Sequence, residues 1–168
     1  MPPSSQPIAP RELHFVALTQ DDPRAQPLLD ELAVEYAQRY ESTPQAVMTW
    51  LTAVPIAEFA PPDGGFIIGE VDGVTVTGGA FQRFDATTAE LKRIWTDRAH
   101  RRRGLASALL AELEAAIAAR GYQRVYLTTG HRQPEAEFLY ESAGYTRLSE
   151  PLPSRGPVFP IAFAKDLT

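Results

Sequence analysis

Cysteine is absent from the 168-residue sequence, and histidine occurs only three times. The missing cysteine excludes disulfides, thiolate zinc sites and a cysteine nucleophile, and it fits a reducing compartment. The histidines, His14, His100 and His131, do not have the spacing of metal ligands, so we expect no metal site. No apolar run approaches the roughly 20 residues that a membrane-spanning helix needs. These absences favour a soluble, cytoplasmic protein without a membrane partner.

Positive charge is in the minority, because 16 Lys and Arg face 21 Asp and Glu and give a formal net charge of -5. A negative protein repels nucleic acid over long range. The basic cluster of Lys92, Arg93, Arg98 and Arg101–Arg103 also has no recognisable platform on which bases could stack. We therefore expect no nucleic-acid partner.

The first ten residues, MPPSSQPIAP, have neither the basic nor the apolar region of a signal peptide. We expect residues 1–10 to form a disordered lead and residues 11–168 to form one domain, because this length suffices for a single hydrophobic core. Hydrophobic periodicity predicts the element order β-α-α-β-β-β-α-β-α-β-β, with an antiparallel meander of three strands before Thr96. Asp72-Gly73 favours a tight turn within this meander.

The stretch HRRRGLASALLAELE, residues 100–114, places three arginines and a glycine where a strand leads into a helix. The first N–H groups of a helix have no partner within it, and together with the helix dipole they favour an anion. Gly104 and Ala106 leave room for an anion to approach the backbone, and the arginines add charged donors. The pattern predicts a pyrophosphate site. Taken alone, the same residues also fit a solvated basic loop with a turn glycine.

Two blocks carry a family resemblance. The segment RRRGLA, Arg101 to Ala106, resembles the [QR]-x-x-G-x-[GA] signature of the GNAT N-acetyltransferase family. The segment QPEAEFLYESAGY resembles the N-x-x-A-x-x-x-Y-x-x-x-G-[FY] element of that family, with Gln133 in place of the usual Asn. The resemblance covers Ala89 to Leu148. It implies an α/β fold of the GNAT type, a mixed, mostly antiparallel twisted sheet of about seven strands flanked by about four helices.

The resemblance also implies that acetyl-CoA is the co-substrate. Backbone groups on the strand before the signature, at Ile94, Trp95 and Thr96, are expected to meet the pantetheine arm and the thioester. The expected pyrophosphate and further cofactor contacts are Arg101, Arg102, Arg103, Gly104, Leu105, Ala106, Ser107 and Gln133. Tyr140 matches a tyrosine that lies near the sulfur and serves as general acid, and core packing is its alternative role.

Glu90 is the leading candidate for general base. In a regular strand Glu90, Lys92, Ile94 and Thr96 share one face, which would aim the carboxylate at the thioester region. A paired carboxylate without a catalytic role, with a water chain as base, is the alternative. No G-x-S-x-G motif is present for a serine nucleophile, so direct transfer is the simplest mechanism.

The sequence thus predicts an enzyme, an acetyl-CoA:amine N-acetyltransferase that acts on a primary amine of a small molecule, peptide or protein as a monomer or homodimer. The acceptor pocket is expected from the first two helices, which carry Glu31, Glu35, Tyr36, Tyr40, Glu41 and Trp50. The alternative is a non-catalytic module that binds CoA for regulation or protein interaction.

Overall fold

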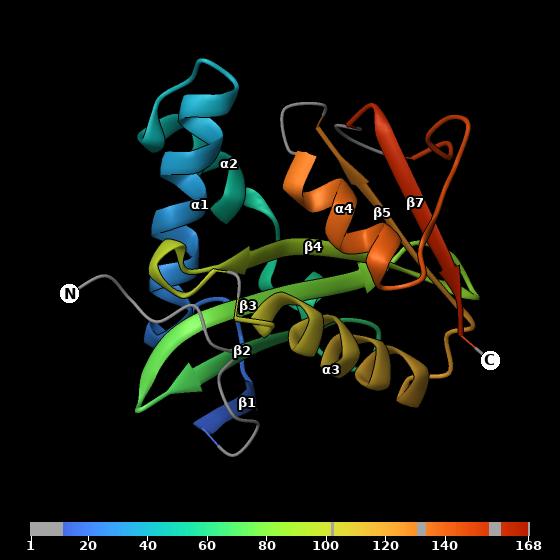
Figure 1. Cartoon of the computed structure of the whole chain (residues 1–168), viewed down its shortest axis with the longest axis horizontal. Coiled ribbons are helices and arrows are strands. Elements are labelled where there is room, and N and C mark those ends of the chain that lie inside the picture. The colour runs from blue at the N-terminus through green and yellow to red at the C-terminus, as the bar shows by residue number, and fades with distance from the viewer. Residues whose placement is uncertain (1–11, 102, 131–133, 155–158, 168) are drawn as a thin grey trace.

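The computed structural model describes residues 12–101, 103–130, 134–154 and 159–167. The predicted lead, residues 1–10, lies outside these ranges. Within them the chain forms one seven-stranded sheet with the strand order β1-β2-β3-β4-β5-β7-β6 and four α-helices (Figure 1). The strands are β1 (Leu13–Ala17), β2 (Gly65–Val71), β3 (Val74–Arg83), β4 (Thr88–Thr96), β5 (Arg124–Thr129), β6 (Thr146–Arg147) and β7 (Ile161–Asp166). The helices are α1 (Gln26–Arg39), α2 (Pro44–Ala53), α3 (Leu105–Ala119) and α4 (Pro134–Ser142). The predicted order and fold class are confirmed.

Local chemistry explains where several of these elements begin and turn. Thr43 caps α2, because its hydroxyl accepts a hydrogen bond from the Ala46 N–H at 3.1 Å. Asp72 and Gly73, at φ 52° and 77°, form the turn between β2 and β3, and two left-handed residues in succession match the twist of a hairpin. The sequence therefore specifies the meander at its turn as well as in its strands.

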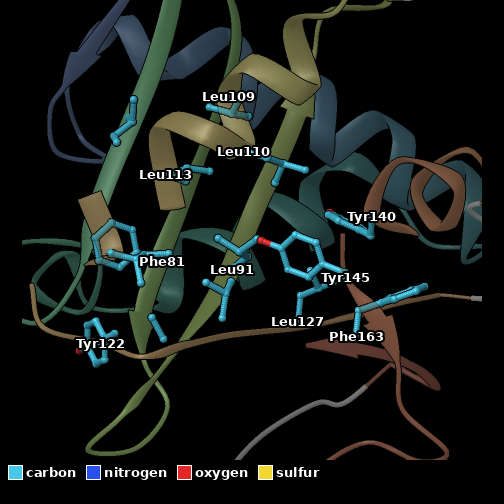
Figure 2. Packing of buried hydrophobic residues seen from close by; sticks show 14 of the residues in the cluster. Phe81, Leu91, Leu109, Leu110, Leu113, Tyr122, Leu127, Tyr140, Tyr145 and Phe163 are labelled. Atoms are coloured by element: carbon cyan, nitrogen blue, oxygen red, sulfur yellow. The ribbon is translucent and has the colours of Figure 1, made fainter. Parts of the chain in front are cut away.

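Two hydrophobic cores lie on opposite faces of the sheet. Helices α1 and α2 cover one face, where Leu28, Leu32 and Leu51 contact apolar residues of the central strands. Helix α3 covers the other face, and Figure 2 shows its leucines beside Phe81 and Leu91 of the sheet. Each fully buried leucine stabilises the fold by about 1.5 to 3 kcal/mol relative to an exposed one. The helices are thus fixed on both faces of the central strands.

The sheet opens between β4 and β5. These parallel strands pair only through Thr88, Ala89 and Glu90 opposite Arg124, Val125 and Tyr126. Beyond Glu90 they diverge, as Figure 1 shows, while β4 stays paired with β3 up to Thr96. The remaining parts of β4 and β5 therefore form the two arms of a wedge.

A β-bulge at Arg93 interrupts β4 inside this wedge. Ala80 lies opposite Lys92 and Gly78 lies opposite Trp95, so Arg93 and Ile94 together face a single β3 residue. Arg93 has a left-handed backbone with φ 62°. The extra residue reverses the alternation of side chains, and Ile94 joins the core under α3 while Trp95 joins the core under α1. The prediction that Glu90, Lys92, Ile94 and Thr96 share one face is therefore wrong.

Candidate active site

A cavity of about 610 Å³ occupies the wedge. Its walls include residues 91–96 on β4, residues 127–130 on and after β5, and residues 104–107 at the start of α3. Helix α1 contributes Tyr36 and helix α4 contributes Tyr140. Segments that are far apart in the sequence, from Leu32 to Phe159, therefore meet at one site.

Most residues that the sequence predicts for cofactor binding line this cavity. They are Ile94, Trp95, Thr96, Arg101, Gly104, Leu105, Ala106, Ser107 and Tyr140. Arg103 and Glu90 are not part of the lining. Arg102 and Gln133 lie outside the described residues. The structure thus brings together the strand, the helix start and the tyrosine that the sequence places far apart.

Gly104 forms the N-cap of α3 in a left-handed conformation with φ 78°. No side chain caps the helix, and its first turn contains no acidic residue, so the N–H groups of the first turn face the cavity without a competing carboxylate. A Cβ atom added at Gly104 would meet no heavy atom within 4 Å. The backbone at this helix start is therefore accessible to an anion such as a pyrophosphate, which fits its free donors and its dipole.

The arginines before Gly104 differ in their surroundings. The Arg101 guanidinium pairs with the Glu35 carboxylate of α1 at 2.5 Å and donates from Nε to the Thr96 carbonyl at 3.3 Å. Arg103, which adjoins Gly104, forms no ion pair with another described residue. Arg103 is therefore available to an external anion, whereas Arg101 holds the loop against α1.

Only part of the β4 edge that faces the wedge is paired with another strand. The Trp95 carbonyl accepts a hydrogen bond from the Thr77 hydroxyl of β3 at 2.8 Å, and Asp97 N–H donates to the Val76 carbonyl at 2.7 Å. Backbone groups of successive strand residues point to opposite edges. Trp95 and Asp97 therefore direct their backbone groups toward β3, and Thr96 between them directs its own toward the open side.

Tyr140 lies in the aromatic core and also reaches the cavity. Its ring centroid is 5.7 Å from that of Tyr145 and 5.8 Å from that of Phe163, and Figure 2 shows the three rings together. Burial raises the pKa of the Tyr140 phenol above its ordinary value. The hydroxyl is therefore protonated at neutral pH and can donate a proton or a hydrogen bond into the cavity.

Glu90 occupies a different environment. The residue is only 5% exposed. Its carboxylate accepts a hydrogen bond from the Gln82 side chain at 3.2 Å and forms an ion pair with Lys92 at 3.3 Å. Lys92 lines the cavity, but Glu90 does not. The structure therefore separates the predicted base from the predicted acid and cofactor residues.

The wall formed by α1 and α2 contains the aromatic residues Tyr36 and Trp50, which the sequence assigns to the acceptor pocket. Glu35 also lines the cavity, but Glu31 and Glu41 do not. Arg93 is a lining residue that the sequence analysis missed. The strand pattern offers no signal for its inward position, because the bulge that turns it inward depends on pairing with β3.

No group of three or more histidine, aspartate and glutamate side chains arranged to hold a metal ion occurs among the described residues. None of the helices in the described ranges combines the length and apolar character that spanning a bilayer requires.

Comparison with known proteins identifies a family over the segment that contains the cavity. A model of the acetyltransferase (GNAT) family matches residues 25–145, which include the wedge, the start of α3 and Tyr140. The chain belongs to the GNAT family. No curated protein matches it. The family assignment therefore agrees with the two motifs that the sequence shares with the family.

Solved structures of GNAT proteins share the fold at low sequence identity. An acetyltransferase from Staphylococcus aureus Mu50 has a TM-score of 0.73 at 15% identity, over 93% of this chain and 99% of that one. A putative acyl-CoA N-acyltransferase from Klebsiella pneumoniae has a TM-score of 0.71 at 22% identity, over 93% and 98% of the two chains. A GNAT acetyltransferase from Elizabethkingia anophelis, solved with acetyl-CoA bound, has a TM-score of 0.65 at 16% identity, over 93% and 99%. These likenesses establish the fold.

Proposed function

We propose that this GNAT protein is an acetyl-CoA-dependent N-acetyltransferase that moves an acetyl group to a primary amine by direct transfer. The observation that carries the proposal is the wedge between β4 and β5, which leads from the uncapped start of α3 to the Tyr140 side chain. The Elizabethkingia protein of the same fold binds acetyl-CoA, which supports the same co-substrate here. Membership of the family supports acyl transfer.

The cofactor is assigned to the wedge. The pyrophosphate is expected at the N–H groups of Leu105, Ala106 and Ser107, where the helix dipole favours negative charge. Arg103 adds positive charge at the same end, and Arg102 and Gln133 remain predicted contacts. The pantetheine arm is expected along Ile94 and Thr96, which line the cavity on the part of β4 that is not paired with β5.

The net reaction forms a C–N bond and an S–H bond and breaks a C–S bond and an N–H bond. The neutral amine attacks the thioester carbonyl carbon, a C–N bond forms, and the carbonyl oxygen takes up negative charge. A backbone N–H of the open β4 edge stabilises this charge. The carbonyl then re-forms as the C–S bond breaks, the CoA thiolate takes a proton from Tyr140, and the nitrogen loses its extra proton to water. Solvent reprotonates Tyr140, and the products are an amide and CoA.

Water, rather than Glu90, is the proposed acceptor of the amine proton. Glu90 lies outside the cavity lining, and its carboxylate is already bonded to Gln82 and Lys92. A general base must come within about 3.2 Å of the proton it removes, directly or through one water. Glu90 as the base stays a hypothesis that substitution can test.

A non-catalytic CoA-binding module is the second candidate, because burial of the Tyr140 ring also fits simple packing. Calorimetry with acetyl-CoA and CoA tests the cofactor site, and release of free thiol with a panel of primary amines tests turnover. Mass spectrometry of the products confirms that the acetyl group is on nitrogen. Binding without thiol release on any amine identifies the module, and absence of binding refutes both functions. The cytoplasmic location and the monomeric or homodimeric state stay predictions, and light scattering measures the latter.

A further inference from the structure

Arg93 is a buried cation whose partners are neutral. Its side chain lies against the C-terminal half of α2, and the residue is only 7% exposed. The guanidinium donates to the Leu51 carbonyl at 2.7 Å and to the Gln20 side-chain oxygen at 3.3 Å. It also lies over the Phe59 ring at 5.2 Å and the Trp50 ring at 5.7 Å. Removing an ion from water costs free energy that neutral partners offset only in part.

Every other described cation in the cavity lining has a carboxylate within 4 Å. The pairs are Lys92 with Glu90, Arg39 with Glu135, Arg101 with Glu35, and His100 with Asp97. The two carboxylates of the lining, Glu35 and Glu135, are both used in these pairs. Arg93 has no such partner among the described residues, although it is the most buried of these cations. Among the described residues, one positive charge of the cavity therefore has no balancing carboxylate.

A structural role accounts for only part of this arrangement. Leu51 lies near the C-terminal end of α2, where carbonyl groups and the helix dipole favour a cation. The bonds to Leu51 and Gln20 use two of the five N–H groups of the guanidinium. Arg93 nevertheless lines the cavity beside Tyr36 and Trp50. Burial lowers its pKa to about 10, so the side chain remains charged at neutral pH.

We propose that Arg93 binds a carboxylate of the acceptor, so that the substrate is a small amine that also carries a carboxylate. This inference rests on the proposed acetyl transfer and names its acceptor class. Tyr36, Trp50 and Leu32 provide an apolar wall for the body of the substrate, which makes apolar amino acids its simplest members. The Arg93 charge also disfavours a second cation in the cavity, which favours the neutral, nucleophilic form of the amine. Polyamines, which carry several positive charges and no carboxylate, are expected to be poor acceptors.

The test uses pairs of acceptors that differ only in the carboxylate: L-leucine with 3-methylbutylamine, and L-phenylalanine with 2-phenylethylamine. The measured quantity is kcat/KM from thiol release for wild type, Arg93→Gln and Arg93→Lys. For each pair we compare the kcat/KM of the amino acid with that of the matching amine. The basicity of the two amines differs within a pair but is the same for every enzyme, so a change in this ratio between enzymes isolates the role of Arg93. Arg93→Gln should lower the ratio of acid to amine about 10- to 100-fold, the usual value of a hydrogen bond to a charged group. Arg93→Lys should restore part of the ratio.

Arg83→Gln is the matched control, because Arg83 is an exposed arginine of β3 outside the cavity lining. It should leave both ratios unchanged. A loss of activity on all four acceptors alike in Arg93→Gln, with an unchanged ratio, would assign Arg93 to the support of α2 alone and overturn the proposal.

A binding measurement on the wild type keeps the inference separate from turnover and from the folding of variants. In the presence of CoA, N-acetyl-L-leucine should bind at least about tenfold more tightly than N-(3-methylbutyl)acetamide. Equal binding of these two neutral-nitrogen probes refutes the carboxylate site even if acetyl transfer is observed. Tight binding of the acid without thiol release from any amine would instead retain the carboxylate site and refute the transfer reaction.

Discussion

The Glu35 carboxylate of α1 and the Arg101 guanidinium form an ion pair of 2.5 Å that joins the cavity wall formed by α1 and α2 to the loop before α3. Arg101 also donates to the Thr96 carbonyl at the end of β4. The first arginine of the cofactor signature therefore has partners within the protein. Its neighbour Arg103 has no ion-pair partner among the described residues, so the two arginines should contribute differently to cofactor binding.

Arg103→Ala should weaken acetyl-CoA binding about 3- to 10-fold and flatten its dependence on salt, because a charge near the pyrophosphate is lost. Arg101→Ala should change affinity less but lower thermal stability, since a partly exposed ion pair contributes at most about 1 kcal/mol, or about 2 to 4 °C in Tm. Calorimetry at two salt concentrations and a melting curve measure these effects. Equal losses of acetyl-CoA affinity in the two variants would contradict the assignment of cofactor binding to Arg103 and of loop support to Arg101.

Gly104→Glu should abolish most acetyl-CoA binding. The substitution adds bulk and negative charge at the start of α3, where the dipole otherwise favours an anion, and a loss of about 10- to 100-fold is expected. Gly73→Glu is the control, because Gly73 has nearly the same backbone, φ 77° against 78°, and similar open space around its Cβ position. Both variants should lose about 1 to 2 kcal/mol of stability from the left-handed backbone. Retained affinity in a folded Gly104→Glu would place the anion site elsewhere.

Tyr140→Phe should lower kcat about 10²-fold with little change in acetyl-CoA affinity, because only the proton donor is removed and the ring stays in the core. Tyr145→Phe is the matched control. Its ring is 5.7 Å from that of Tyr140, but its hydroxyl donates to Glu114 and the residue does not line the cavity. The control should lose about 0.5 to 1.5 kcal/mol of stability and keep its turnover. Full kcat in Tyr140→Phe, with chemistry rate-limiting, would make water the proton donor.

The pH profile provides an independent check on Tyr140. Burial raises the pKa of this phenol above the ordinary value of about 10, so the protonated form is favoured in the folded protein. The protonated phenol therefore makes its full contribution to the stability of the fold below about pH 10, and this contribution is lost as the pH rises through the raised pKa of the folded protein. The rate should increase with pH as the acceptor amine loses its proton and then stay level to about pH 10. A decline between pH 8 and 10 that Tyr140→Phe lacks would show that the pKa is not raised.

Glu90→Gln should keep kcat within about threefold of wild type, because the carboxylate lies outside the cavity lining. Some stability should be lost, since Lys92 loses its partner. Steady-state kinetics with a reactive amine and a melting curve separate the two effects. A fall in kcat of about 10² to 10⁴-fold would instead identify Glu90 as the general base acting through water.

Elements that depend on near neighbours could be predicted from the sequence. Asp72-Gly73 specified a turn by its backbone preference, Thr43 and Pro44 specified the start of α2, and Gly104 marked the start of α3. The resemblance of the two motifs to the GNAT family also implied that Gly104 and Tyr140 belong to one cofactor site, and both residues line the same cavity. In each case the information lies in the preferences of a few consecutive residues, or in the resemblance of short motifs to a family.

Pairing between distant segments decided the rest. The bulge at Arg93 reverses the alternation of β4, and only the register with β3 determines where the extra residue lies. For this reason the sequence placed Glu90 beside Ile94 and missed Arg93 as a cavity residue. The pairing of Arg101 with Glu35 across 66 positions likewise required α1 to lie against the wedge. The sequence by itself determined the elements and the glycine at the start of α3, whereas the tertiary structure decided which charges face the cavity, because strand register and long-range contacts are set by packing rather than by local periodicity.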